Sequence, residues 1–192
     1  MIRGLYNWTM RLGESRYALV ALAVIAFVES SVFPIPPDVL LIPMIIALPR
    51  RAFLIAFVAT VSSVLGGMFG YYIGAVLFDS IGQPLLDFYG KAAQFDQFKD
   101  TYNEYGAWAV LVAGVTPFPF KVITILSGST GLDFGVFVLS SVLARAARFF
   151  VIAALLWKFG VPIRTFIEKR LGLVFTVALA LLVGGFVAVK FF

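Results

Sequence analysis

Long apolar stretches, separated by short polar or proline-containing breaks, dominate the chain. The apolar segments cover residues 17–33, 39–48, 52–78, 107–126, 134–157 and 171–189. A helix needs about 20 apolar residues to cross the hydrocarbon layer of a bilayer. Only the segments that begin at Ala52, Phe134 and Leu171 reach this length comfortably. We therefore expect three full transmembrane helices, over residues 52–78, 133–157 and 171–190.

Prolines interrupt the other two apolar regions. One break, at residues 33–38, contains Pro34, Pro36 and Pro37, and the other, at residues 116–121, contains Pro117 and Pro119. Proline lacks a backbone donor and disfavours helix in the preceding residue, so neither region forms a continuous helix. Non-helical backbone at membrane depth survives only where protein or a watery cavity satisfies it. We therefore predict two re-entrant helical hairpins, over residues 17–49 and 107–131.

Charges predict how these elements are oriented. Arg16 precedes the first hairpin, and Arg50 and Arg51 follow it, so the positive-inside rule places both ends of the hairpin, and the N-terminus, on the cytoplasmic side. The connection 79–105 is poor in lysine and arginine, as non-cytoplasmic loops are, and the helix that ends near Lys158 returns to the cytoplasm. The two hairpins then enter from opposite sides, an inverted repeat typical of transporters.

Two further segments are predicted to lie at the membrane surface. Residues 1–16 carry Tyr6, Trp8 and three arginines, which indicates an interfacial helix. Within the acidic amphipathic connection 79–105, the stretch 88–105 is predicted to be an amphipathic surface helix, with Phe95, Phe98 and Tyr102 on its apolar side. Together the segments form a single all-α membrane domain over residues 1–192.

Small residues are spaced at helical intervals in the span over residues 52–78. Ser62, Gly66, Gly70 and Gly74 form a ridge that allows close helix contact, within one subunit or between two. The stretch 127–131 (Ser-Gly-Ser-Thr-Gly) indicates either a nucleophile or anion-binding turn, or a helix–loop junction with satisfied hydroxyls. The spacing is not Gly-x-Ser-x-Gly, so we favour the junction.

The amino-acid composition restricts the functions that the chain can have. Of 192 residues 61% are apolar and 13% charged, with a mean hydropathy of +1.01, so lipid must be the solvent for most of the chain. The absence of cysteine and histidine excludes thiol catalysis and a Ser-His-Asp triad, and no phosphate-binding loop occurs. We expect no enzymatic activity, no cofactor and no metal. The net charge of +5 resides at the ends of apolar runs, so we expect no nucleic-acid partner.

Ionisable residues within or beside the apolar segments are the candidate functional site. They comprise two acids and three bases: Glu29, Asp38, Lys121, Arg145 and Arg148. Each costs about 2.5–3.5 kcal/mol at a helix centre, so we expect them to be paired. If the hairpin tips meet, the set has one excess positive charge, which a phosphate-bearing headgroup would complete. Lys121, Arg145 and Arg148 would then bind the phosphate together, and the two acids would orient or gate it.

Two other interpretations of these charges remain open. A buried carboxyl at Glu29 or Asp38 could couple transport to protons, because desolvation favours its neutral form. Alternatively, the charges pair only to fix the packing of the hairpins, and Asp38 caps the helix that follows Pro37.

Three motifs in this order resemble the DedA superfamily of membrane proteins (the VTT or SNARE-associated group), and its YqaA-like branch most closely. They are the stretch 29–38 (Glu-Ser-Ser-Val-Phe-Pro-Ile-Pro-Pro-Asp), the stretch 114–121 with the following Ser127-Gly128, and the stretch 145–149 (Arg-Ala-Ala-Arg-Phe). The resemblance covers residues 17–157. It implies two opposed re-entrant hairpins and a role in moving lipids, including polyprenyl phosphates and phospholipids, across bilayers.

The resemblance also assigns individual residues. Glu29 and Asp38 match the acidic pair of the family, and Lys121 stands where many members have arginine. Val115 replaces a second arginine that is common in other branches, so polyprenyl-phosphate specificity does not carry over directly.

We therefore expect a lipid flippase or scramblase for an anionic lipid, either a phospholipid or a polyprenyl phosphate, in a bacterial inner membrane. The alternatives are a proton-coupled transporter of small solutes or ions, and a membrane-organising protein that transports nothing. A homo-oligomer is compatible with each.

Overall fold

The computed structural model describes residues 17–33, 36–90, 92–116 and 118–169. All regular elements in these residues are helical, as expected for an all-α protein. They are α2 (Ala18–Ser31), α3 (Asp38–Ala47), the 3-10 turn η1 (Pro49–Arg51), α4 (Ala52–Leu77), the π-helical turn η2 (Phe78–Gly82), α5 (Gln83–Phe88), α6 (Ala92–Val115), α7 (Phe120–Ser129) and α8 (Phe134–Lys169). The predicted interfacial helix 1–16 and the predicted span 171–190 lie outside the described residues.

Two helical runs among the described residues are long and apolar enough to cross a membrane. The first, Pro49–Phe88, contains α4, and the second, Phe134–Gly160, is the greater part of α8. They correspond to the predicted spans 52–78 and 133–157. The helix α8 continues to Lys169, but the backbone of Phe159 leaves the helical conformation at φ −119° and ψ 16°. The apolar part of α8 therefore ends close to the predicted boundary.

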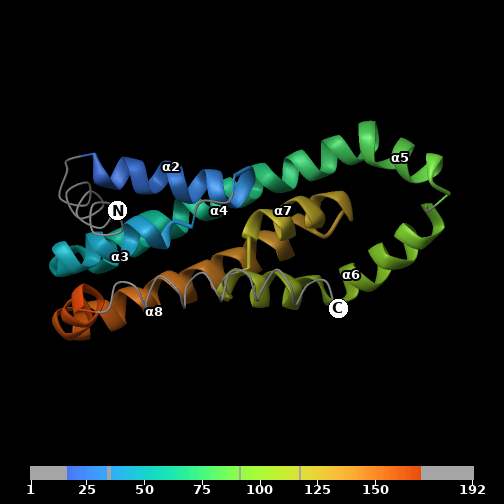
Figure 1. Cartoon of the computed structure of the whole chain (residues 1–192). Coiled ribbons are helices and arrows are strands. Elements are labelled where there is room, and N and C mark those ends of the chain that lie inside the picture. The colour runs from blue at the N-terminus through green and yellow to red at the C-terminus, as the bar shows by residue number, and fades with distance from the viewer. Residues whose placement is uncertain (1–16, 34–35, 91, 117, 170–192) are drawn as a thin grey trace.

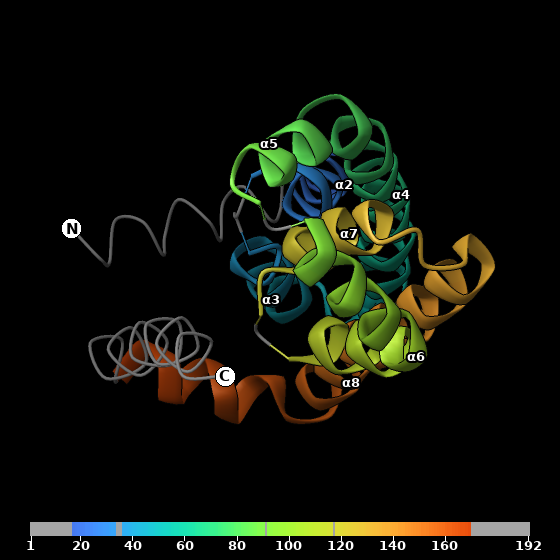
Figure 2. The ribbon, with the colours of Figure 1, turned by 90° about the vertical axis from the view of Figure 1, so that its right-hand side faces the viewer.

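The described helices form two hairpins that approach each other from opposite ends of the molecule. Figure 1 shows α2 and α3 extending from one end of α4, and α6 and α7 extending from the other. Helix α2 stops at Ser31 and α6 stops at Val115, just before the proline-containing breaks. In the end-on view of Figure 2, α7 lies near the middle of the bundle, with α2, α4 and α6 around it. The re-entrant placement of these hairpins in a bilayer stays a prediction.

The first arm of the second hairpin is longer than the sequence analysis predicts. We expected a separate surface helix before a hairpin that begins at residue 107, whereas α6 runs without interruption from Ala92 to Val115. Its aromatic side packs as expected, because Phe95 stacks on Phe78 and continues through Phe98 to Tyr102. No proline occurs between Ala92 and Val115, so nothing in the backbone forces the expected boundary.

Glycines on α4 bring three helices into backbone contact. A Cβ atom added at Gly66 would lie 2.1 Å from the carbonyl oxygen of Phe27 in α2. At Gly74 it would lie 2.0 Å from the carbonyl oxygen of Ile125 in α7, and Gly70 faces Thr124 in the same helix. The predicted ridge therefore packs helices within one chain, and both hairpins pack against α4.

Substitution of a ridge glycine tests this packing. Gly74→Ala places a methyl group on the backbone of α7, and we expect a loss of about 1–3 kcal/mol of stability from overpacking. The matched control is Gly160→Ala in α8, because no atom lies within 4 Å of a Cβ at that position. Thermal unfolding in detergent compares the two variants. A Gly74→Ala protein as stable as the control would contradict the close contact of α4 with α7.

Candidate functional site

Glu29 and Arg145 form a buried ion pair where the hairpin tips meet. Glu29 lies in the last turn of α2, Arg145 lies in α8, and the Nη2 atom of Arg145 is 2.8 Å from Oε2 of Glu29. The side chains are 8% and 2% exposed, respectively. We call these two residues the inner pair. Its ions are removed from solvent, so it requires further polar partners.

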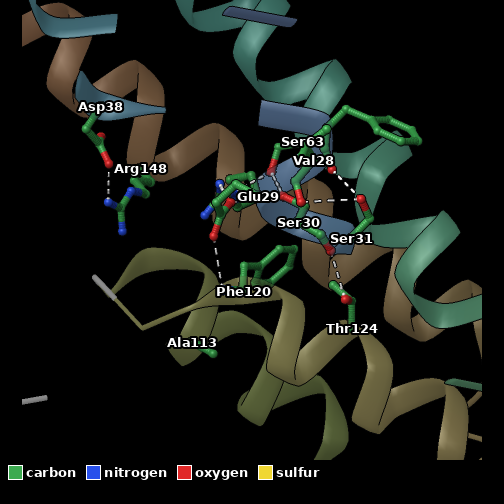
Figure 3. A network of polar contacts seen from close by, with 12 residues as sticks. Val28, Glu29, Ser30, Ser31, Asp38, Ser63, Ala113, Phe120, Thr124 and Arg148 are labelled. Atoms are coloured by element: carbon green, nitrogen blue, oxygen red, sulfur yellow. Dashed lines mark hydrogen bonds and ion pairs between the residues drawn. The ribbon is translucent and has the colours of Figure 1, made fainter. Parts of the chain in front are cut away.

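Two serines close a ring of hydrogen bonds around the inner pair. Nε of Arg145 donates to Oγ of Ser63 in α4 at 2.6 Å, and Oγ of Ser30 donates to Oε2 of Glu29 at 3.1 Å. The two hydroxyls are 2.7 Å apart. Since Ser63 accepts from Arg145 and Ser30 donates to Glu29, Ser63 must donate to Ser30. The ring therefore fixes the direction in which each serine hydroxyl donates. Figure 3 shows Ser30 and Ser63 beside Glu29 in this ring.

Aromatic rings enclose the guanidinium of Arg145. Its Cζ atom lies 4.9 Å from the ring centroid of Phe120 and 4.7 Å from that of Phe149. Both rings are fully buried. A cation over an aromatic face is stabilised, most strongly when it is desolvated. Arg145 is thus held by a carboxylate, a hydroxyl and two rings, which leaves it poorly accessible to a ligand.

The hairpin tips cap each other. Oε1 of Glu29, from the first hairpin, accepts a hydrogen bond at 3.2 Å from the backbone N–H of Phe120, the first residue of α7. In return, Nζ of Lys121, from the second hairpin, donates at 3.0 Å to the carbonyl of Val32, which follows the last residue of α2. A helix start favours negative charge and a helix end favours positive charge. Each tip therefore supplies the charge that the end of the opposite helix requires.

Asp38 and Arg148 form a second ion pair, which we call the outer pair. Nη2 of Arg148 lies 2.6 Å from Oδ2 of Asp38, and the side chains are 15% and 18% exposed. Nη1 of Arg148 also donates to the carbonyl of Thr116, immediately beyond the end of α6. Asp38 is the first residue of α3, but its Oδ2 binds Arg148 and its Oδ1 has no partner among the described residues, so neither oxygen caps that helix. The interpretation of Asp38 as a simple helix cap is therefore incomplete, because its carboxylate binds Arg148.

The outer pair and Lys121 retain polar groups that are available to bind a ligand. Among the described residues, Oδ1 of Asp38 and Nε of Arg148 are buried without a hydrogen-bond partner. Lys121 makes no ion pair with a carboxylate in the same part of the chain, and its side chain is half-buried. In the inner pair, by contrast, both carboxylate oxygens of Glu29 and two guanidinium nitrogens of Arg145 are bound by protein groups, and both side chains are almost fully buried. A ligand would therefore meet the outer pair and Lys121 first.

The five predicted charges thus separate into three groups. The inner pair and the outer pair each join an acid of the first hairpin to an arginine of α8, and Lys121 lies between the tips. Pro36, Pro37 and Pro119 lie at the breaks, whereas Pro34 and Pro117 lie outside the described residues. No cluster of three or more possible metal ligands occurs among the described residues.

Hydroxyl groups at the tips were not predicted as part of the site. Ser30, Ser63 and Thr124 connect α2, α4 and α7, and Thr124 donates to the carbonyl of Ser30 at 2.9 Å. A serine next to Glu29 inside an apolar segment was the available signal. The stretch 127–131 is a helix–loop junction as predicted, because Ser127 bonds to Tyr102 at 2.9 Å and Thr130 to the carbonyl of Leu126 at 3.0 Å.

The fold and the site define a helical membrane protein with paired ions at the meeting point of two opposed hairpins. The VTT domain matches residues 35–158, which include Asp38, Lys121, Arg145 and Arg148 but begin after Glu29. The chain therefore belongs to the VTT-domain family, the DedA family, whose members are transporter-like membrane proteins.

Two relatives extend this match over most of the chain. An uncharacterized protein of Haemophilus influenzae is 36% identical over 168 residues, which cover 85% of this chain and 87% of the relative. A protein of Histophilus somni, described as a homologue of an uncharacterized protein, is 38% identical over the same coverage. No solved structure matches the chain.

Disruption of the inner pair should destabilise the protein strongly. Glu29→Gln leaves the charge of Arg145 buried without its counter-charge, and we expect a loss of about 3–5 kcal/mol. The double variant Glu29→Gln/Arg145→Met removes both charges, so it should lose less than the sum of the two single variants. Thermal unfolding in detergent measures all three.

Asp38→Asn is the comparison for this experiment. The outer pair is more exposed, so solvent screens its loss and the expected destabilisation is smaller. Additive effects of Glu29→Gln and Arg145→Met, or an equal effect of Asp38→Asn, would contradict the assignment of Glu29 and Arg145 as the more strongly coupled pair.

Proposed function

We propose that the protein moves the headgroup of an anionic lipid across the bilayer, along the interface between the two hairpins. The observation that carries this proposal is that Lys121 has no carboxylate partner among the described residues and the outer pair has two unpartnered polar atoms, whereas the inner pair is almost fully buried. With two acids against three bases, the site has one excess positive charge, which an anion would balance. Membership of a transporter-like membrane family also supports a transport function.

The depth of the site supports a role within the hydrocarbon layer. Ser63 is 11 residues from the start of α4, or about 17 Å along a helix of about 39 Å. Arg145 is 11 residues from the start of α8, again about 17 Å, although it belongs to a different helix. Both partners of the ring therefore lie near the middle of their spans. Charges at this depth are functional sites by default.

A lipid explains the surroundings of the site better than a small solute. Apolar side chains next to the polar groups of the tips are exposed: Val32 and Phe33 by 58% each, Val39 by 52%, Val115 by 49% and Val122 by 44%. In a bilayer these side chains face hydrocarbon, so a headgroup could reach Lys121 while its chains stay in the membrane. The route that we propose therefore runs along a lipid-facing surface.

The residues take different roles in this proposal. Lys121 and Arg148 contact the phosphate, and Asp38 holds Arg148 in place until the headgroup arrives. Glu29 and Arg145 fix the tips against each other and do not contact the lipid, in contrast to the expectation that Arg145 binds the phosphate directly. Arginine suits phosphate because its planar donors match two oxygens at once.

Proton coupling is the second candidate, and Asp38 is the acid that favours it. Both oxygens of Glu29 accept hydrogen bonds, whereas Oδ1 of Asp38 has no partner among the described residues. If transport consumes a proton gradient, Asp38→Asn should abolish that dependence. Transport that does not depend on the gradient would show that the lipid moves without proton coupling.

Substitution of Lys121 tests the lipid proposal. Lys121→Gln keeps a donor for the carbonyl of Val32 but removes the charge, so we expect leaflet exchange of an anionic phospholipid to slow roughly tenfold, the equivalent of about 1.4 kcal/mol. Lys121→Arg keeps the charge and should stay within about twofold of the wild type. Vesicles reconstituted with purified protein and labelled phosphatidylglycerol provide the measurement.

Two outcomes would contradict the proposal. One is wild-type protein that fails to accelerate exchange of any anionic lipid over protein-free vesicles. The other is a Lys121→Gln variant as fast as Lys121→Arg, which would leave the charges with the structural role of the membrane-organising alternative.

A further inference from the structure

A groove lies between α6 and α7, on the second hairpin. Its volume is about 460 Å³, which is within the range of roughly 300–1,000 Å³ that small-molecule sites occupy. The lining is almost wholly apolar and consists of Tyr105, Trp108, Ala109, Val112, Ala113, Thr116, Phe118 and Ile123. Trp108 and Val112 are 68% and 60% exposed, so the groove is open along its length.

The groove is about as long as one leaflet is thick. Tyr105 and Thr116 mark its two ends along α6, and 11 residues of helix rise about 17 Å. Half of a hydrocarbon layer of about 30 Å is about 15 Å. Tyr105 and Trp108 follow the polar half of α6, and aromatic residues of this kind favour the membrane–water interface. The groove thus extends from the interface toward the hairpin tips.

The inner end of the groove lies beside a positively charged side chain, Arg148. Thr116, which lines the groove, accepts a hydrogen bond from Arg148 through its carbonyl. Phe118 and Ile123 also line the groove, and Lys121 lies between them in sequence, although its side chain is not part of the lining and donates to the carbonyl of Val32. Nε of Arg148 is buried there without a partner among the described residues. An apolar groove with a guanidinium group beside its inner end is complementary to a molecule with a hydrocarbon chain and an anionic head.

We infer that this groove holds one hydrocarbon chain of a membrane lipid whose anionic headgroup lies at Lys121 and Arg148. The inference rests on the proposed function and adds the path of the chain. The lipid therefore binds in one orientation, with its head at the hairpin tips and its tail directed toward the interface at Tyr105.

A second groove on the molecule does not have these features. It has a volume of about 580 Å³, and Phe27, Leu65, Phe69, Tyr72 and Phe134 are among its lining residues. None of its lining residues makes any of the hydrogen bonds or ion pairs given above for Lys121, Asp38 and Arg148. This groove offers hydrocarbon contact alone, so it serves as the comparison for the experiment.

Filling the α6–α7 groove tests the inference. Ala109→Trp places a large ring in the groove, whereas Ala107→Trp places the same ring on the other flank of the buried face formed by Gly106 and Val110. Both alanines are half-buried, but Ala109 also packs against the core cluster that contains Val110 and Phe120, so the comparison requires that both variants unfold at the wild-type temperature. The probe is phosphatidylglycerol with a photoreactive group in its acyl chain, cross-linked to the full-length protein in vesicles and mapped by peptide mass spectrometry.

We expect cross-links in the wild type to concentrate on residues 105–123, and Ala109→Trp to reduce them at least fivefold. Ala107→Trp should leave them within about twofold of the wild type, with both variants checked for wild-type thermal unfolding. Phosphatidylcholine with the same chain should label the groove less than the anionic lipid.

Equal labelling of both grooves, or equal effects of Ala107→Trp and Ala109→Trp, would overturn the inference. These results separate it from the proposed function. If Lys121→Gln slows exchange but Ala109→Trp changes neither labelling nor exchange, the chain path is wrong and the headgroup proposal stands. If labelling of the groove is strong but independent of headgroup charge and of Lys121, the assigned position of the head is wrong and the inference fails with it.

Discussion

Backbone groups at the ends of four interrupted helices determine how the hairpin tips are built. Each break leaves N–H or C=O groups without intrahelical partners, and hydrocarbon offers none. Glu29 accepts from the start of α7, Lys121 donates to the end of α2, and Arg148 donates beyond the end of α6. Neither hairpin could satisfy these ends alone. At the membrane depth that we predict for the tips, the cost of breaking a helix would require the two hairpins to fold against each other.

The need to satisfy these helix ends divides the charged residues into two kinds. Some stabilise the fold, and others remain available to bind a ligand. Arg145 is enclosed by Glu29, Ser63 and two rings, so its removal disturbs packing before it disturbs any ligand. Arg148 and Lys121 serve helix ends as well, but they retain exposure, and Nε of Arg148 has no partner among the described residues. A transporter needs both kinds of charge, because a polar route through hydrocarbon must be stable when it is empty and must also bind its cargo.

Much of the architecture follows from local sequence signals. The prolines predict both breaks, because their ring and missing donor act within a few residues. The spacing of Gly66, Gly70 and Gly74 likewise predicts a close-packed face on α4. The partner of that face could not be predicted, because the contact of Gly66 with Phe27 and of Gly74 with Ile125 depends on the position of both hairpins. The continuity of α6 was missed because a change from polar to apolar composition was interpreted as a boundary.

The residues that form the site were easier to predict than the ion pairs that they make. All five charges were identified, since ions are expensive in apolar segments. Arg145 and Arg148 are three residues apart and were expected to act together, yet each binds a different acid, and these acids are nine residues apart on either side of a break. Ser63 rather than Ser62 completes the ring because of the rotation of α4, which sequence periodicity fixes only approximately.

Membrane depth at the hairpin tips tests the central claim most directly. The chain contains no cysteine, so a single spin label can be attached at Val32→Cys or Val115→Cys, both exposed positions at the breaks, or at Phe88→Cys in α5 as a reference. Collision with oxygen and with a water-soluble paramagnetic reagent then reports depth in reconstituted vesicles. Our account predicts that Val32 and Val115 lie at similar depth within the hydrocarbon layer, and that Phe88 lies near its surface. Labels at Val32 and Val115 that collide freely with the water-soluble reagent would show that the helix ends lie in water, where no reciprocal capping is required.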